Sequence, residues 1–179
     1  RSVELRPTRY LAHGGEGAES VGRATMDFQP RVGDDLAIDG TAYRFVQHPG
    51  ASSIVMPWKQ IGRRGAVYAV AAANGTHHAL KVFSPPFRDA RIATSVERLR
   101  WYAQLPVLHA CDRLVLTPDR HGALLQQYPD LTYAVLMPWI IGETWFDIVV
   151  DHKALSPSQS HDLSRTMAES LATLETWGV

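Results

Sequence analysis

Two short apolar runs around a turn dipeptide open the patterned part of the chain. Leu36-Ala37-Ile38 precedes Asp39-Gly40, and residues 42–46 follow it. Asp-Gly between two such runs is typical of a two-residue β-hairpin turn. The sequence therefore predicts a hairpin near residues 35–46, whereas the glycine-rich stretch before it predicts no helix.

A second hairpin is predicted from residues 66–70 and 79–83. Both runs are rich in residues that favour strands, and the loop between them contains Asn74-Gly75. Pro85-Pro86 ends the second strand, because proline has no amide hydrogen for a ladder. Residues 113–117 and 133–139 read as further strands, and the segment between them stays unassigned.

Two helices complete the pattern. Between Asp89 and Leu105 the apolar residues recur at helical spacing: Ile92, Val96, Leu99 and Ala103. The second helix begins at Ser156, with Pro157 at its first position and Gln159 placed for a capping box. Its apolar stripe is Leu163, Met167, Leu171 and Leu174, and Gly178 suits its end. The order of elements predicts an α+β fold.

Composition narrows the class of protein. The 179 residues are enough for one domain or slightly more, and 18 basic side chains balance 18 acidic ones, so no net field attracts nucleic acid or an anionic membrane. A single cysteine, Cys111, excludes an internal disulfide framework and fits a reducing, cytoplasmic location, and no apolar run is long enough to span a membrane. The chain starts at Arg1 and ends on Val179, so we expect it to have been cut from a longer protein.

The candidate chemistry lies in the second hairpin. Gly62 and Gly65 precede its first strand, and Lys81 lies in its second strand. Glycine lets backbone amides approach phosphate oxygens, and lysine supplies a compact cation to bind them. The two-residue period of a strand puts Ala79 and Lys81 on one face, where a nucleotide would fit. By themselves, a glycine pair is common in turns and a strand lysine is usually solvated.

In order and spacing, these residues resemble the Gly-rich loop G-x-G-x-x-G-x-V and the V-A-I-K strand of protein kinases. By that resemblance Gly62, Gly65 and Val67 occupy the second glycine, third glycine and valine positions, and Gln60 stands where the first glycine is expected. A second registration makes Gly62 the first glycine of a shortened loop, and the sequence does not choose between the two.

The resemblance extends from Trp58 to Val179. It implies that Glu97, on the predicted helix, pairs with Lys81, although a glutamate there is as often a plain surface residue. Residues 135–144 resemble the strand and hinge between two kinase lobes, in which Met137 is the gatekeeper or simply a core residue. The backbones of Pro138 and Ile140 would then meet the adenine edge.

The resemblance implies a kinase-like N-lobe, an antiparallel sheet with one regulatory helix, over residues 58–140. Residues 1–57 are then an N-terminal extension, and residues 141–179 contain the first helices of the C-lobe. Neither H-R-D-x-x-x-x-N nor D-F-G occurs in the chain. The expected catalytic Asp and Mg²⁺ ligands therefore lie beyond Val179, and no metal site is expected within the chain.

The expected function is the ATP-binding part of a Ser/Thr protein kinase, acting on a protein substrate. Lys81 would hold the α and β phosphates. The alternative is a pseudokinase or regulatory module that binds a protein partner without phosphoryl transfer, which the departure at Gln60 favours. A small-molecule kinase with a related lobe is a third possibility.

Overall fold

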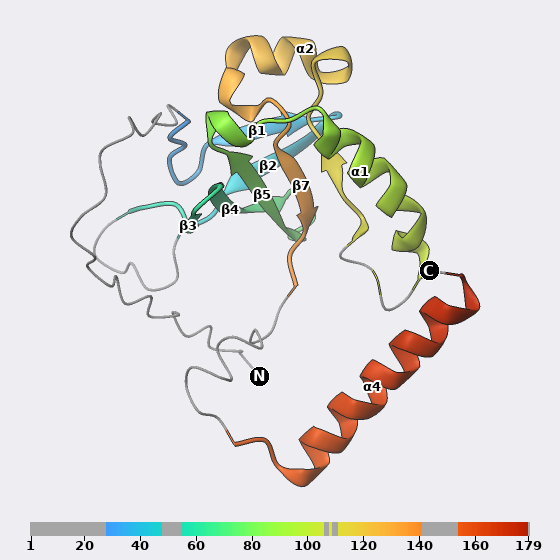
Figure 1. Ribbon diagram of the computed structural model, residues 1–179. Helices are drawn as coiled ribbons and strands as arrows, with labels where there is room; N and C mark the ends of the chain where they lie inside the picture. The colour runs from blue at the N-terminus through green and yellow to red at the C-terminus, as the bar shows by residue number, and fades with distance from the viewer. Residues whose placement is uncertain (1–27, 48–54, 106–107, 109–110, 141–153, 179) are drawn as a thin grey trace, which may run out of the picture. The chain divides into compact units, whose positions relative to one another are not determined.

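The computed structural model describes residues 28–47, 55–105, 108, 111–140 and 154–178. The chain divides into two units, residues 1–140 and 141–179. The first unit is an α+β fold built on a curled antiparallel sheet, in agreement with the fold class predicted from the sequence (Figure 1).

Seven strands form the sheet in the part of the chain that the structure describes. Their order is β1-β2-β4-β5-β7-β6, with β3 pairing separately with β4. In chain order the elements are β1 (Asp35–Ile38), β2 (Thr41–Phe45), β3 (Lys59–Gly62), β4 (Gly65–Ala72), β5 (His77–Phe83), α1 (Arg91–Arg100), β6 (Leu114–Val115), α2 (Pro118–Gln127) and β7 (Val135–Pro138). Short 3-10 turns lie at η1 (Pro85–Phe87), η2 (Trp101–Gln104) and η4 (Pro129–Leu131).

The first predicted hairpin is confirmed and is part of the main sheet. Ile38 and Thr41 are direct partners, so the turn contains only Asp39 and Gly40, at φ +49° and +79°. Two positive φ values in a two-residue turn are the reason that Asp-Gly is favoured there. Strand β2 then pairs with β4, so the hairpin extends the sheet, a placement that the sequence left open.

The main hydrophobic core lies on one face of this sheet. Tyr68 on β4, Leu80 on β5 and Leu136 on β7 point to that face, because they are direct partners across the strands. The buried core cluster also contains Phe28, Leu36, Ile38, Phe45, Ala66, Val70, Val82, Leu116, Leu125, Leu131 and Ala134. The alternate residues of β4, β5 and β7 consequently point to the opposite face.

The segment left unassigned by the sequence contains α2, which supplies Leu125 to the core. Thr117 is its N-cap residue in an extended conformation, and Pro118 follows at the first helical position. Proline is favoured at this position because an amide hydrogen there, which proline lacks, would have no acceptor within the helix. Figure 1 shows α2 near β1, whereas α1 runs alongside β6 and β7.

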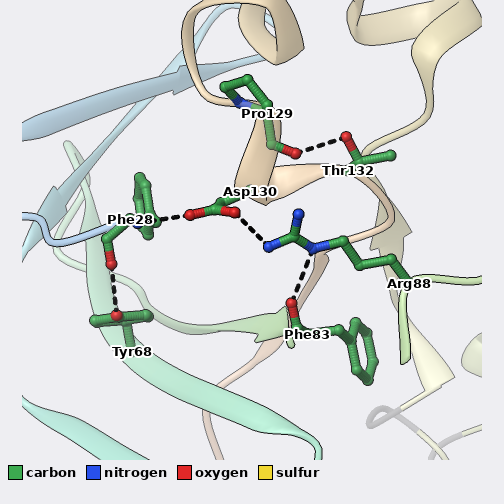
Figure 2. A network of polar contacts seen from close by, with 7 residues as sticks. All are labelled: Phe28, Tyr68, Phe83, Arg88, Pro129, Asp130 and Thr132. Carbon is green, nitrogen blue, oxygen red and sulfur yellow. Dashed lines mark hydrogen bonds and ion pairs between the residues drawn. The ribbon is translucent and has the colours of Figure 1, made fainter. Parts of the chain in front are cut away.

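A polar network fixes the connection into α1 against the core (Figure 2). The Arg88 guanidinium forms an ion pair with Asp130 and donates from Nε to the Phe83 carbonyl at 3.0 Å. The other Asp130 oxygen accepts the Phe28 amide hydrogen at 2.7 Å, and the Tyr68 hydroxyl donates to the Phe28 carbonyl at 3.1 Å. Segments far apart in the sequence are thus joined at one point, three residues before α1 begins.

The second unit contains α4 (Pro157–Thr176), the second predicted helix. Both bonds of the capping box are present: the Gln159 amide donates to Ser156 Oγ at 3.2 Å, and the Ser156 amide donates to Gln159 Oε1 at 2.9 Å. Gly178 has φ +69°, the left-handed backbone conformation expected of a glycine that ends a helix. No helix among the described residues is long and apolar enough to cross a membrane.

Candidate functional site

The hairpin formed by β3 and β4 has a tight turn at its tip. Gly62 and Gly65 are direct partners, so only Arg63 and Arg64 form the turn, and both are exposed. The Arg64 guanidinium lies 6.0 Å from the centroid of the Phe87 ring. The tip therefore brings two cationic side chains and two glycines together.

The fold needs glycine at position 65 but not at position 62. Gly65 has φ +152°, and a Cβ added there would lie 2.0 Å from the Val82 carbonyl oxygen, so the fold itself requires glycine at this position. A Cβ at Gly62 would have only the Gly65 oxygen within 4 Å, at an ordinary contact distance of 3.8 Å. Packing does not require glycine at position 62, so a requirement there would have to come from a ligand.

The face of the sheet opposite the core carries the expected nucleotide-contacting side chains. Val67 is the direct partner of Lys81, which is in turn the partner of Val135. One row along, Ala79 is the partner of Met137. We call this surface of β4, β5 and β7 the site face. The two-residue strand period, applied to the sequence, predicts that Ala79 and Lys81 share it, and the structure confirms this.

Lys81 is a half-buried cation on this face, and no acidic residue in the described part of the chain is its partner. Its Nζ lies 5.1 Å from the centroid of the Phe83 ring, two residues along the same strand. None of the ion pairs among the described residues includes Lys81. A lysine held by an aromatic ring and lacking a carboxylate keeps its donors available to an anion.

A cavity of about 490 Å³ opens beside Lys81, between α1 and the site face. Its volume is within the range usual for small-molecule sites. Three of its side chains are basic: Lys81, Arg91 and Arg113. The remaining lining residues are Asp89 and Ser95, together with the apolar Phe83, Ile92, Val96, Leu99, Val135 and Met137.

Asp89 is the acidic residue among the described side chains that line the cavity, and Arg91 neutralises it. The guanidinium of Arg91 and its backbone amide both donate to the Asp89 carboxylate, and together they lower the pKa of Asp89 below its ordinary value. The cavity thus combines an apolar floor with several basic side chains, which suits an anion attached to an apolar group. The sequence analysis missed Arg91 and Arg113, since only the fold brings them to Lys81.

The structure does not bring Glu97 to Lys81. The residues of α1 that line the cavity are Ile92, Ser95, Val96 and Leu99. Glu97 follows Val96 by one residue, or about 100° around the helix. It is exposed and lines a separate hollow with Ala93, Thr94 and Arg98, and no ion pair joins it to Lys81.

The predicted hinge residues fall in different environments. Met137 lies on the site face and lines the cavity. Pro138 pairs with His78 and therefore points to the opposite face, while Ile140 is 64% exposed at the end of the first unit. Between them, the Trp139 amide donates to the His77 carbonyl at 3.2 Å, which continues the β5–β7 ladder by one residue.

An aromatic pair that the sequence analysis did not single out lies at the hinge end of the site face. The rings of Trp58 and Trp139 meet in a T-shaped arrangement, with centroids 4.5 Å apart and planes at 81°. Both side chains are partly exposed. The strand period predicts a face for each tryptophan, but their contact depends on the order of strands in the sheet.

Comparison with known proteins gives no assignment. The chain matches no family model, no curated protein and no solved structure. Among the described residues, no group of three or more His, Cys, Asp or Glu side chains is placed to hold a metal ion.

Proposed function

We propose that the first unit binds a nucleoside triphosphate in the manner of a protein-kinase N-lobe, with Lys81 as the phosphate-binding cation. The observation that carries the proposal is the environment of Lys81: it is half-buried, has no carboxylate partner among the described residues, and lies beside a cavity that Arg91 and Arg113 also line. Gly62, at the tip of the adjoining hairpin, has room for a ligand to approach the backbone.

By its resemblance to protein kinases, the lobe serves an ATP-dependent transfer to Ser or Thr hydroxyls of a protein, with Mg²⁺ as the metal. Lys81 would bind the α and β phosphates, and Pro138 and Ile140 would offer backbone groups to the base. Pairing Glu97 with Lys81 would require α1 to turn its polar side toward the sheet, and the nucleotide binding proposed here does not depend on that pair.

The alternative proposal is a pseudokinase or regulatory module. It is favoured by Gln60 in place of a loop glycine. The two proposals differ in phosphoryl transfer, so incubation of the full-length protein with labelled ATP, Mg²⁺ and a Ser/Thr-containing protein separates them. Labelled protein supports the kinase, and binding of ATP without labelling supports the module.

Nucleotide binding is tested by calorimetric titration of the 179-residue chain with Mg-ATP. Lys81→Met is expected to weaken binding about tenfold or more, because a hydrogen bond to a charged group contributes roughly 1.5–3 kcal/mol. Lys59→Met is the matched control, since Lys59 is an exposed lysine on β3 whose partner Tyr68 points to the core face.

Two outcomes of this titration contradict the proposal. One is the absence of any ATP binding by a folded chain. The other is equal affinity in Lys81→Met and the unmodified chain, which would remove Lys81 from the site. Thermal unfolding of both variants verifies that the fold is retained.

A further inference from the structure

The Trp58–Trp139 pair spans the site face where the nucleotide base is expected. Trp58 lies opposite Ala69, whose amide donates to the Trp58 carbonyl at 3.0 Å, and Trp139 follows Met137 by one strand period. Three strand-to-strand spacings, about 14 Å in all, therefore separate the two backbones. Rings only 4.5 Å apart must lean toward each other over β4 and β5.

The alanines beneath the rings support this placement. Ala69 and Ala79 are direct partners on the site face and are only 5% and 6% exposed. Neither belongs to the buried core cluster on the opposite face. Something on the site face must cover them, and in the part of the chain that the structure describes the joined rings of Trp58 and Trp139 are candidates for that cover.

We propose that the rings of Trp58 and Trp139 form the surface that binds the nucleotide base, which we call the base-binding wall. The base then contacts these rings instead of Ala69 and Ala79, which the rings cover. The inference rests on the nucleotide binding proposed above and identifies what holds the base. Both rings of this T-shaped pair are partly exposed, and a purine stacks favourably on an exposed aromatic surface. The phosphates then extend along the site face toward Lys81, which lies one strand period beyond Ala79.

If the tryptophan pair binds only the base, its substitution should weaken the binding of ATP and leave the binding of phosphates alone unchanged. Trp139→Leu and Trp58→Leu are each expected to weaken Mg-ATP binding about tenfold, because a base stacked on an aromatic side chain contributes to affinity on that scale. Neither substitution is expected to change the affinity for Mg-tripolyphosphate, which has the phosphates and no base. Lys81→Met is expected to weaken both ligands.

Trp101→Leu is the matched control, since Trp101 is 61% exposed in η2 and lies outside the site face. ATP affinity that is unchanged in folded Trp58→Leu and Trp139→Leu overturns the base-binding wall and leaves the nucleotide site standing. Failure of the unmodified chain to bind ATP overturns both proposals.

A second measurement covers the case in which the leucine variants do not fold. In the otherwise unmodified chain, ATP is expected to change the tryptophan emission, and tripolyphosphate is not. The change should persist in Trp101→Phe and should fall in the conservative variants Trp58→Phe and Trp139→Phe. An ATP response identical in all four proteins overturns the proposal.

Discussion

Substitution of Gly65 by alanine tests whether the β3–β4 hairpin is held as the structure describes. The added Cβ would lie 2.0 Å from the Val82 carbonyl oxygen and 2.9 Å from the Phe83 Cα, both backbone atoms of β5. A backbone cannot yield as the end of a flexible side chain does. Strand β4 must therefore move away from β5 at the end where Gly65 and Phe83 pair.

Two effects set the size of the loss. The φ of +152° lies in a region nearly reserved for glycine, where another residue costs about 1–3 kcal/mol. Separating the strands also weakens ladder hydrogen bonds, each contributing about 1 kcal/mol. Together they lower the free energy of unfolding by about 3 kcal/mol, a large part of the roughly 5–15 kcal/mol that holds a typical domain.

Gly62→Ala is the internal control, because its Cβ meets nothing closer than 3.8 Å and Gly62 is not among the positive-φ residues. Its free energy of unfolding is expected to stay within about 1 kcal/mol of the unmodified chain. Urea unfolding followed by circular dichroism measures both variants. With a slope of about 1–3 kcal/mol per molar, Gly65→Ala should lower the midpoint by about 1–3 M. Equal midpoints for Gly65→Ala and the unmodified chain would refute this steric account.

Three further substitutions test other parts of the structure. Burial, and to a smaller extent the charge of Asp130, raises the pKa of Tyr68, so the folded state favours the neutral phenol. The contribution of Tyr68 to the free energy of unfolding is therefore complete below pH 10 and declines as the pH rises above it. Tyr68→Phe should show a shallower alkaline loss of unfolding free energy, and an unchanged slope would contradict this. Asp130→Ala leaves Arg88 unpaired where both side chains are 18% exposed, and thermal unfolding should report a loss of about 3 kcal/mol; a loss under 1 kcal/mol would argue against a stabilising pair. Ser156→Ala removes one capping-box bond and should lower the helicity of a peptide of residues 154–178, with a cost of about 1 kcal/mol; equal helicity would show that the cap is dispensable.

Local signals made much of the fold predictable. Asp39-Gly40 and Asn74-Gly75 mark the two hairpins, and both lie in tight turns at the expected places. The capping residues at Ser156 and Gln159 fixed the start of α4. Each of these features depends on neighbours within a few residues, so the sequence contains all the information needed.

Two elements, α2 and β3, were not predicted from the sequence because their local signals are weak. Helix α2 has Thr117-Pro118-Asp119 at its start, which is a usable N-terminal signal, but Gly122 and a non-helical φ of −120° at His121 interrupt it. Strand β3 is four residues long and exposed throughout, so no burial pattern marks it. It is a strand because β4 offers it a partner.

The candidate site also has some features that the sequence predicts and others that it does not. Strand alternation alone put Ala79 and Lys81 on one face. The position of Glu97 was also contained in the sequence, because the apolar stripe through Ile92, Val96 and Leu99 leaves it on the polar side of α1. The cavity and the tryptophan pair depend on which strands become neighbours, and no local pattern specifies that order.

Strands β2 and β3 share one edge of β4, and this has a consequence for motion. Strand β2 occupies the half of β4 from Val70 to Ala72, and β3 occupies the half from Gly65 to Tyr68. All four residues of β3 are exposed, so separating it from β4 uncovers little apolar surface and breaks few bonds. Local opening of β3 therefore costs much less than unfolding the sheet, and the turn at Arg63-Arg64 can adjust to a ligand while β4 and β5 hold Lys81 in place.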